Sequence, residues 1–133
     1  MGRARAIGLC GVGIVAALVL SAAQLPRALS QTSPGVWELS GLPNSSAPLR
    51  QCVADTALLA RVEHRGQHCT QAVISDTPAT TVIEYKCSQG GFGQSKLTLI
   101  TPRSLRIETQ GISRGYPFNY VFQARRVANC DAH

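Results

Sequence analysis

Cysteine and histidine are the residues of this chain best suited to bind a metal or act as nucleophiles. Cys52, Cys69, Cys87 and Cys130 follow the first thirty residues, and no two of them form a Cys-x-x-Cys pair. Because four-thiolate zinc sites ordinarily use such pairs, the spacing argues against a structural zinc site. An even number of cysteines in a short exported chain predicts two disulfides instead. Oxidised sulfurs of this kind would be structural and could not attack a substrate.

The histidine spacing suggests a metal site only at first sight. His64 and His68 are four residues apart, and Cys69 follows directly. Gly66 lies between the two histidines and interrupts the helix that would bring them together. We therefore interpret them as a solvated pair. No acid pair, Ser-His-Asp set or metal motif stands out elsewhere, so we assign no catalytic, cofactor-binding or metal-binding residue and expect no enzyme.

A β-hairpin is predicted to position two of the cysteines. Residues 69–87 form two β-rich runs around a turn cluster at residues 76–79. Folding the hairpin at this turn places Cys69 opposite Cys87. Directly opposed residues at a non-hydrogen-bonded position have Cα atoms about 4.5 Å apart, which is within disulfide reach. We therefore predict a Cys69–Cys87 disulfide that closes the base of the hairpin.

The first thirty residues have the three-part layout of a secretory signal. Two arginines precede an uncharged, mostly apolar run at residues 7–20, and small residues follow. Cleavage after Ala23 or after Ser30 satisfies the small-x-small rule, and we prefer Ser30 because Pro26 would end the apolar helix just before it. An uncleaved membrane anchor is the alternative. The run is short for a spanning helix, which needs about 20 apolar residues, but the stretch from Ile7 to Leu25 comes close.

Cleavage after Ser30 leaves residues 31–133 as one domain. Ten basic and seven acidic side chains remain in it, which gives a net charge of +3. This small excess gives no reason to expect a nucleic-acid partner. The signal and the paired cysteines predict a periplasmic or secreted protein. After cleavage we expect no membrane association and a monomer.

Alternating apolar and polar residues predict a mainly β fold. We expect an antiparallel meander sheet of about seven strands, able to curl into a small barrel, with one short helix at residues 57–62. Trp37 is expected to anchor the core. With Cys69–Cys87 formed, a second disulfide between Cys52 and Cys130 would tie the start of the domain to its end. Four cysteines allow three pairings, and the hairpin argument fixes only one pair.

The order of landmarks resembles the domain-of-unknown-function 3617 family of exported bacterial proteins. The landmarks are Pro34-Gly35-Val36-Trp37-Glu38, Gln51-Cys52-Val53 before a short helix, Cys69, Tyr85-Lys86-Cys87 and Ala124-Arg125-Arg126-Val127-Ala128-Asn129-Cys130. Where that family tends to have a glycine just before the last cysteine, this chain has Asn129. The resemblance implies a periplasmic location and a small β-rich fold. It implies no activity and no site residue.

Three functions compete on this sequence. The first, which we predict, is a non-catalytic binding or interaction module whose partner is an unknown protein or a small apolar ligand. The second is a small barrel that carries an apolar molecule or lipid in a cavity lined by Phe118, Tyr120, Phe122, Trp37 and Leu97. A pocket of several hundred Å3 would favour this carrier, and a solid interior would argue against it. The third, a hydrolase or redox enzyme, would need a free thiol of low pKa.

Overall fold

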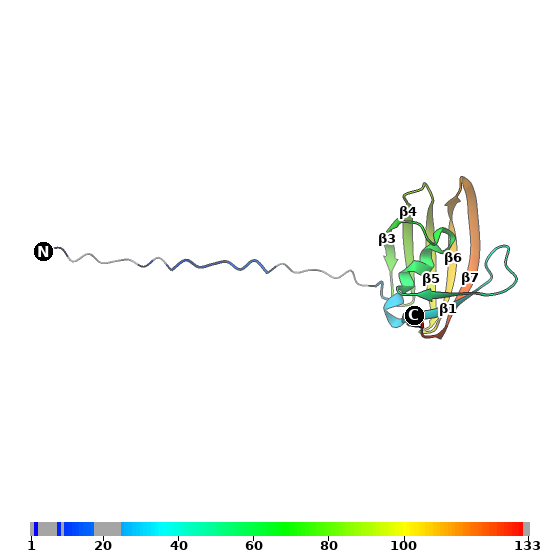
Figure 1. Ribbon diagram of the computed structural model, residues 1–133, viewed down its shortest axis with the longest axis horizontal. Helices are drawn as coiled ribbons and strands as arrows, with labels where there is room; N and C mark the ends of the chain where they lie inside the picture. Colours follow the sequence, from blue (N-terminus) through cyan, green and yellow to red (C-terminus); the bar gives the residue numbers. More distant parts are fainter. Residues whose placement is uncertain (1, 3–7, 9, 18–24, 132–133) are drawn as a thin grey trace.

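The computed structural model describes residues 2, 8, 10–17 and 25–131. It confirms a mainly β fold in which seven strands form one antiparallel sheet (Figure 1). The strands are β1 (Gly35–Ser40), β2 (Leu49–Val53), β3 (Cys69–Asp76), β4 (Thr80–Cys87), β5 (Phe92–Thr101), β6 (Ser104–Ser113) and β7 (Tyr116–Ala128). Two 3₁₀-helical segments, η1 (Leu29–Gln31) and η2 (Thr56–His64), complete the domain.

The sheet is a meander only from β3 to β7. Its strand order is β2-β1-β7-β6-β5-β4-β3, so β1 pairs with the last strand and β2 forms one edge. Strand β3 forms the opposite edge. The two edges do not pair with each other, so the sheet is not a closed barrel in the described part of the chain. It curls nevertheless, and the β1–β2 hairpin lies across one face of the remaining strands (Figure 1).

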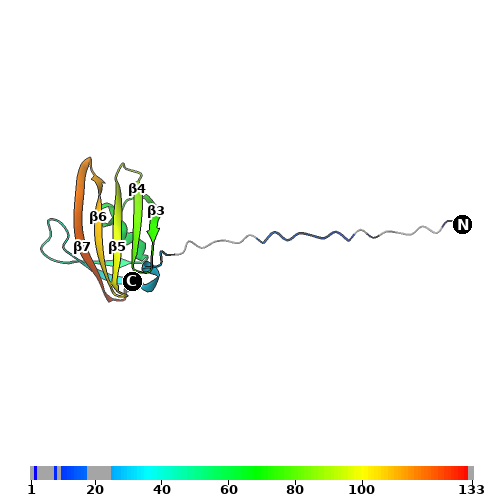
Figure 2. The same cartoon turned by 180° about the vertical axis from the view of Figure 1, so that it is seen from behind.

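The segment η2 carries the chain from one edge of the sheet to the other. It begins after Asp55, whose carboxylate accepts a hydrogen bond from the backbone N–H of Ala57 at 2.9 Å. Leu59 and Val62 are buried against the sheet, and the segment extends beyond the predicted helix at residues 57–62. The segment covers the inner face of the sheet, whereas the outer face is uncovered when the domain is viewed from behind (Figure 2).

The core lies between the inner face of the sheet, η2 and β1. Strand residues that alternate along the sequence point into it, because successive side chains of a strand lie on opposite faces. Trp37 is fully buried, as predicted, and its indole N–H donates to the carbonyl of Ser33 at 3.1 Å. The strand side chains that are at most 1% exposed in this cluster include Leu39, Ile83, Leu97, Leu105, Ile107 and Phe122. Burying each of them contributes about 1.5–3 kcal/mol relative to exposure.

Both predicted disulfides are confirmed. Cys69 lies directly opposite Cys87 in the β3–β4 register, and their sulfurs are bonded. Cys52 on β2 is bonded to Cys130, which follows β7. Two disulfides fit a protein that folds outside the reducing cytoplasm.

The predicted signal segment is described only in part. Residues 1, 3–7, 9 and 18–24 lie outside the described residues, and Ala23 is among them. Residues 10–17 are exposed and lie away from the domain (Figure 1). No helix within the described ranges is both long enough and apolar enough to cross a membrane.

Candidate functional site

A groove of about 870 Å3 opens where the β1–β2 loop faces the β6–β7 turn. Leu42 belongs to the loop wall, and Tyr116 and Phe118 belong to the β7 wall. Glu63, near the end of η2, and Tyr120 contribute to the floor. We call this cavity the Tyr120 groove.

Local turn chemistry fixes the β7 wall of the Tyr120 groove. Arg114 and Gly115 are the two residues between β6 and β7, and Ser113 pairs with Tyr116 across the turn. Both turn residues have positive φ, at 52° and 80°, as a type I′ hairpin requires. This tight turn continues the strand pairing to its last residue and therefore holds Tyr116 at the end of the sheet. The Tyr116 side chain is 76% exposed there.

The floor of the Tyr120 groove carries a short polar contact. The hydroxyl of Tyr120 donates to Oε2 of Glu63 at 2.8 Å. Burial, followed by this hydrogen bond, raises the pKa of Tyr120 well above the ordinary value of 10.0. Arg65 and Arg114 are exposed residues of the same groove. The groove therefore combines aromatic walls with one carboxylate and two guanidinium groups.

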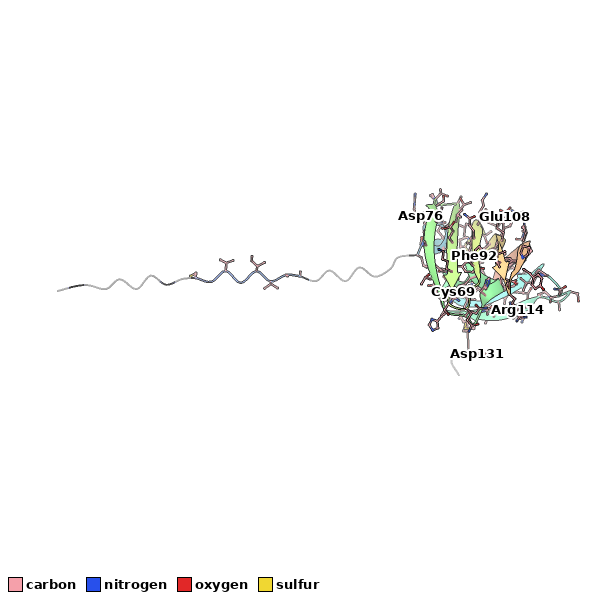
Figure 3. The ribbon with its side chains drawn as sticks, turned by 90° about the horizontal axis from the view of Figure 1, so that it is seen from above. Cys69, Asp76, Phe92, Glu108, Arg114 and Asp131 are labelled. Carbon is pink, nitrogen blue, oxygen red and sulfur yellow. A yellow bond between two sulfur atoms is a disulfide. The ribbon has the colours of Figure 1, made fainter. Side chains whose placement is uncertain are left out.

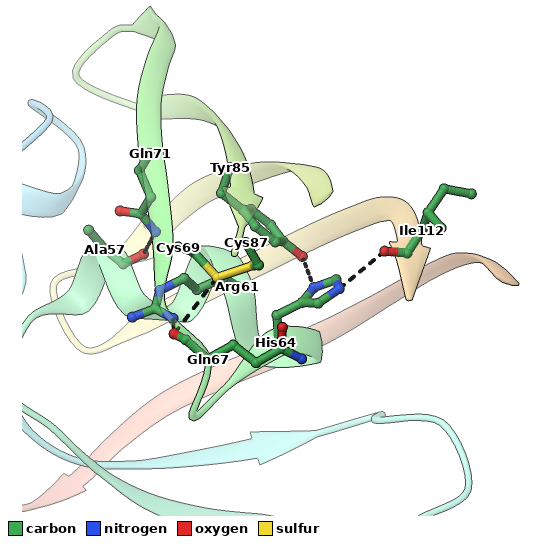
Figure 4. The surroundings of a disulfide bond; sticks show 9 residues. All are labelled: Ala57, Arg61, His64, Gln67, Cys69, Gln71, Tyr85, Cys87 and Ile112. Carbon is green, nitrogen blue, oxygen red and sulfur yellow. Dashed lines mark hydrogen bonds between the residues drawn. A yellow bond between two sulfur atoms is a disulfide. The ribbon is translucent and has the colours of Figure 1, made fainter. Parts of the chain in front are cut away.

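Next to the floor lies an enclosed hydrogen-bonded pair, His64 and Tyr85 (Figure 4). The His64 ring is 1% exposed, its Nε2 lies 3.1 Å from the carbonyl oxygen of Ile112, and its Nδ1 lies 2.8 Å from the Tyr85 hydroxyl. A carbonyl can only accept, so Nε2 carries the proton and, in the neutral ring, Nδ1 accepts from the tyrosine. Burial, reinforced by the Glu63 carboxylate, raises the pKa of Tyr85 to about 12. The Tyr85 hydroxyl therefore keeps its proton at ordinary pH.

The interpretation of His64 and His68 as a solvated pair is wrong for His64. His68 is exposed, but His64 is buried in the domain. The reason is that η2 ends at His64, so its side chain still points to the sheet. Gly66, with φ of 82°, then reverses the chain and turns His68 outward. The sequence showed the interruption but not which histidine would face the core.

The glycine run after β4 makes room for the two rings. A Cβ at Gly91 would overlap Nε2 of His64, and a Cβ at Gly93 would lie 2.6 Å from the Tyr85 hydroxyl. Gly91 and Gly93 therefore allow the His64 and Tyr85 side chains to pack against the backbone. Gly111 pairs with Gly93, and a Cβ at Gly111 would overlap the backbone of Phe92 and Gly93.

The five residues proposed to line a carrier cavity are divided by the structure. Trp37, Leu97 and Phe122 fill the core and are at most 1% exposed. Phe118 and Tyr120 are half-buried and line the Tyr120 groove. The interior between the sheet and η2 is thus solid at the first three positions, and of these five side chains only Phe118 and Tyr120 are accessible from the Tyr120 groove.

A second, shallower groove of about 610 Å3 lies on the outer face of the sheet. Phe92, Ile112 and Pro117 give it an apolar part, and Gln94 and Asn119 lie beside them. Phe92 is 49% exposed. Glu84 and Lys86 also line this groove.

Charged side chains outside the two grooves form ion pairs at the surface. Glu38 lies 3.1 Å from Arg50 and 3.7 Å from Arg125. Exposed pairs of this kind contribute about 0–1 kcal/mol each. Across the described ranges, no group of three or more His, Cys, Asp and Glu side chains is arranged to hold a metal ion.

A scan against protein-family models, a search of curated proteins and a search of solved structures each gave no match. The resemblance to the domain-of-unknown-function 3617 family therefore stays a prediction.

The sequence did not reveal the groove residues Glu63, Arg114 and Leu42. They come from three segments that are distant in sequence, and no local spacing links them. One signal was present for the neighbouring pair: the run Gly90-Gly91-Phe92-Gly93 beside a strand indicates that another side chain approaches the backbone closely.

Proposed function

We propose that this protein is an exported, non-catalytic binding module that holds a small amphipathic ligand in the Tyr120 groove. The observation that supports this most is the groove itself, which combines aromatic walls with a hydrogen-bonded Tyr120–Glu63 floor. Concave sites of several hundred Å3 with a few polar groups among apolar side chains are typical of small-molecule binding. An apolar body would contact Tyr116 and Phe118, and an anionic or hydrogen-bonding end would reach Arg65 or Arg114.

Binding, not catalysis, suits the chemistry of the enclosed groups. The cysteines that follow the export signal are paired in disulfides, so their sulfurs are not nucleophiles. Both ring nitrogens of His64 are occupied by Tyr85 and Ile112, and the ring is shielded from the groove. A general base would need a free nitrogen within reach of a bound substrate.

An apolar carrier function, with a lipid or similar molecule held inside a barrel, is less well supported. Three of the five side chains assigned to its cavity belong to the core instead. The Glu63 carboxylate in the groove would also be costly to cover with a wholly apolar ligand. An amphipathic ligand leaves Glu63 hydrogen-bonded to Tyr120 and avoids this cost.

The proposal is tested with anilinonaphthalene sulfonate, a fluorescent probe that has an aromatic body and an anionic end. Tyr116→Ala removes an exposed wall of the Tyr120 groove without touching the core. We expect it to weaken probe binding about tenfold, which corresponds to 1.4 kcal/mol. Arg114→Glu is expected to weaken binding similarly, because it reverses the charge that faces the sulfonate.

Phe92→Ala is the matched control, since it truncates an exposed aromatic residue in the outer-face groove. Its dissociation constant for the probe should stay within about twofold of the unsubstituted protein. Weakening by Phe92→Ala alone would place the probe on the outer face and contradict the proposal. Circular dichroism of each variant checks that the fold is intact, because partly unfolded states also bind this probe.

A further inference from the structure

The segment before β1, residues 25–32, is part of the folded domain. It contains η1, and its Ala28 and Leu29 are both 0% exposed. Leu29 belongs to the same core cluster as Trp37 and Leu59. A side chain buried among residues of β1 and η2 contributes to the stability of the whole domain.

Polar contacts fix the same segment to two distant elements. The Thr32 hydroxyl donates to the carbonyl of Leu29 at 2.6 Å and lies 2.9 Å from the hydroxyl of Thr56, where η2 begins. The backbone N–H of Arg27 donates to Oδ1 of Asp76 at 2.7 Å. In Figure 3, Asp76 lies on the side of the domain where the N-terminal segment joins it.

A second contact joins the segment to the β3–β4 turn. The side-chain amide of Gln31 donates to the carbonyl of Pro78 at 2.8 Å. Together with the contact at Asp76, it holds η1 against the end of the hairpin formed by β3 and β4. Cleavage after Ser30 would leave the Gln31 contact in place and remove the Arg27 contact with the signal.

Cleavage after Ser30 would therefore remove part of the core. It would separate Ala28 and Leu29 from the domain and cut η1 between Ser30 and Gln31. Cleavage after Ala23 satisfies the same small-x-small rule, through Ser21-Ala22-Ala23, and leaves the docked residues in place. We propose that the export signal is removed after Ala23 and that residues 25–32 remain a permanent part of the protein. This inference rests on the proposed export.

The processing site is tested on the full chain, produced from Met1 in a bacterial host and recovered from the periplasm. Intact mass and N-terminal sequencing should give a chain of residues 24–133. A chain of residues 31–133 would overturn the inference while leaving export intact. Uncleaved protein confined to the cytoplasm would overturn both export and this inference, so the two failures are distinguishable.

Two blocking substitutions sharpen this test. Ala23→Phe places a bulky side chain where the protease requires a small residue, and it should abolish processing. Ser30→Phe changes the rejected site, at an exposed position, and processing should continue to give residue 24 as the first residue. The reverse pattern would show that Ser30 is the processing site.

A stability measurement tests the retained segment independently. Leu29→Ala opens a cavity in the core and should lower the Tm of the exported protein by about 10–20 °C. Leu25→Ala is the matched control, because Leu25 is 37% exposed and should shift the Tm by no more than about 2 °C. If the mature chain began at Gln31, both substitutions would be lost with the signal, and neither would change the Tm.

Discussion

At the scale of single residues, Tyr85 links η2 to the sheet. Its side chain is 2% exposed and its hydroxyl contacts Nδ1 of His64. Burial removes the hydroxyl from water, and the nearby Glu63 carboxylate disfavours a second negative charge, so both raise the pKa of Tyr85. The folded protein therefore holds the phenolic proton more tightly than the unfolded chain does.

This difference makes stability fall at high pH. The pKa of Tyr85 is 10.0 in an unperturbed chain and about 12 in the folded protein. Below pH 10 both states are protonated and the stabilisation is fully present. Between about pH 10 and 12 the unfolded chain releases its proton first, so the free energy of unfolding falls by up to about 1.4 kcal/mol per pH unit for this tyrosine.

Guanidinium denaturation at about pH 9, 10, 11 and 11.5 measures how the free energy of unfolding changes with pH across the window of about pH 10 to 12. Tyr85→Phe should make the decline less steep, because it removes one of two tyrosines whose pKa is raised by folding. Tyr120 keeps its own contribution in this variant. Tyr116→Phe, at a residue that is 76% exposed, serves as the control and should keep the original slope. Equal slopes in all three proteins would contradict the role assigned to Tyr85.

At the scale of elements, the end of η2 and the turn after β4 are fitted to each other. η2 ends at His64, and Gly91 lies against its ring in the connection between β4 and β5. The carbonyl of Gly91 also accepts from the backbone N–H of Cys87 at 2.7 Å, which keeps the turn close to the strand. The end of η2 and the turn after β4 therefore depend on their contact with each other.

Gly91→Ala should therefore destabilise the domain by about 2 kcal/mol, because the added methyl group forces the His64 ring to move. In a His64→Ala background the same change should cost less than about 0.5 kcal/mol, since nothing remains to be displaced. A double-mutant cycle from urea denaturation gives both values. Ser88→Ala, at an exposed turn residue, is the control and should be near neutral.

An equal cost of Gly91→Ala in both backgrounds would contradict the fit between η2 and the turn. The loss would then come from the backbone of the turn itself. Backbone strain is not expected at this position, because Gly91 is not among the glycines with positive φ.

At the scale of the whole molecule, each disulfide anchors one edge strand of the sheet. Cys69 joins β3 to its neighbour β4, and Cys52 joins β2 to the segment that follows β7. Cys69–Cys87 closes a separation of 18 residues within one hairpin, and Cys52–Cys130 closes a separation of 78. In the chain-entropy model a disulfide stabilises the fold by removing conformational entropy from the unfolded chain, and this stabilisation grows with loop length. The model gives about 3 kcal/mol for Cys69–Cys87 and about 4.5 kcal/mol for Cys52–Cys130. The long-range bridge should therefore contribute more to stability.

Replacing each pair by serine tests this order. The Cys52→Ser/Cys130→Ser protein should unfold at lower urea concentration than the Cys69→Ser/Cys87→Ser protein. The latter is the matched control, since it also loses one disulfide and gains two hydroxyls. Equal midpoints, or a larger loss from the hairpin bridge, would show that native-state contacts and not loop closure dominate.

Local pattern was sufficient for much of the fold. The alternation of apolar and polar residues predicted a mainly β fold, because strand geometry alone sets the direction of successive side chains. The Cys69–Cys87 pair followed from counting residues on either side of a turn. The pairing of β1 with β7 was not predicted, because no local feature records which distant strand completes an edge.

The sequence by itself determined a mainly β fold with an antiparallel sheet and two disulfides, and it predicted an export signal. The tertiary structure alone decided that His64 faces the core, that Leu29 belongs to the domain, and that Glu63 and Tyr120 meet in one groove. The reason is physical. Strand periodicity and turn chemistry act over a few residues, whereas burial and groove formation depend on segments that meet only when η2 crosses the sheet.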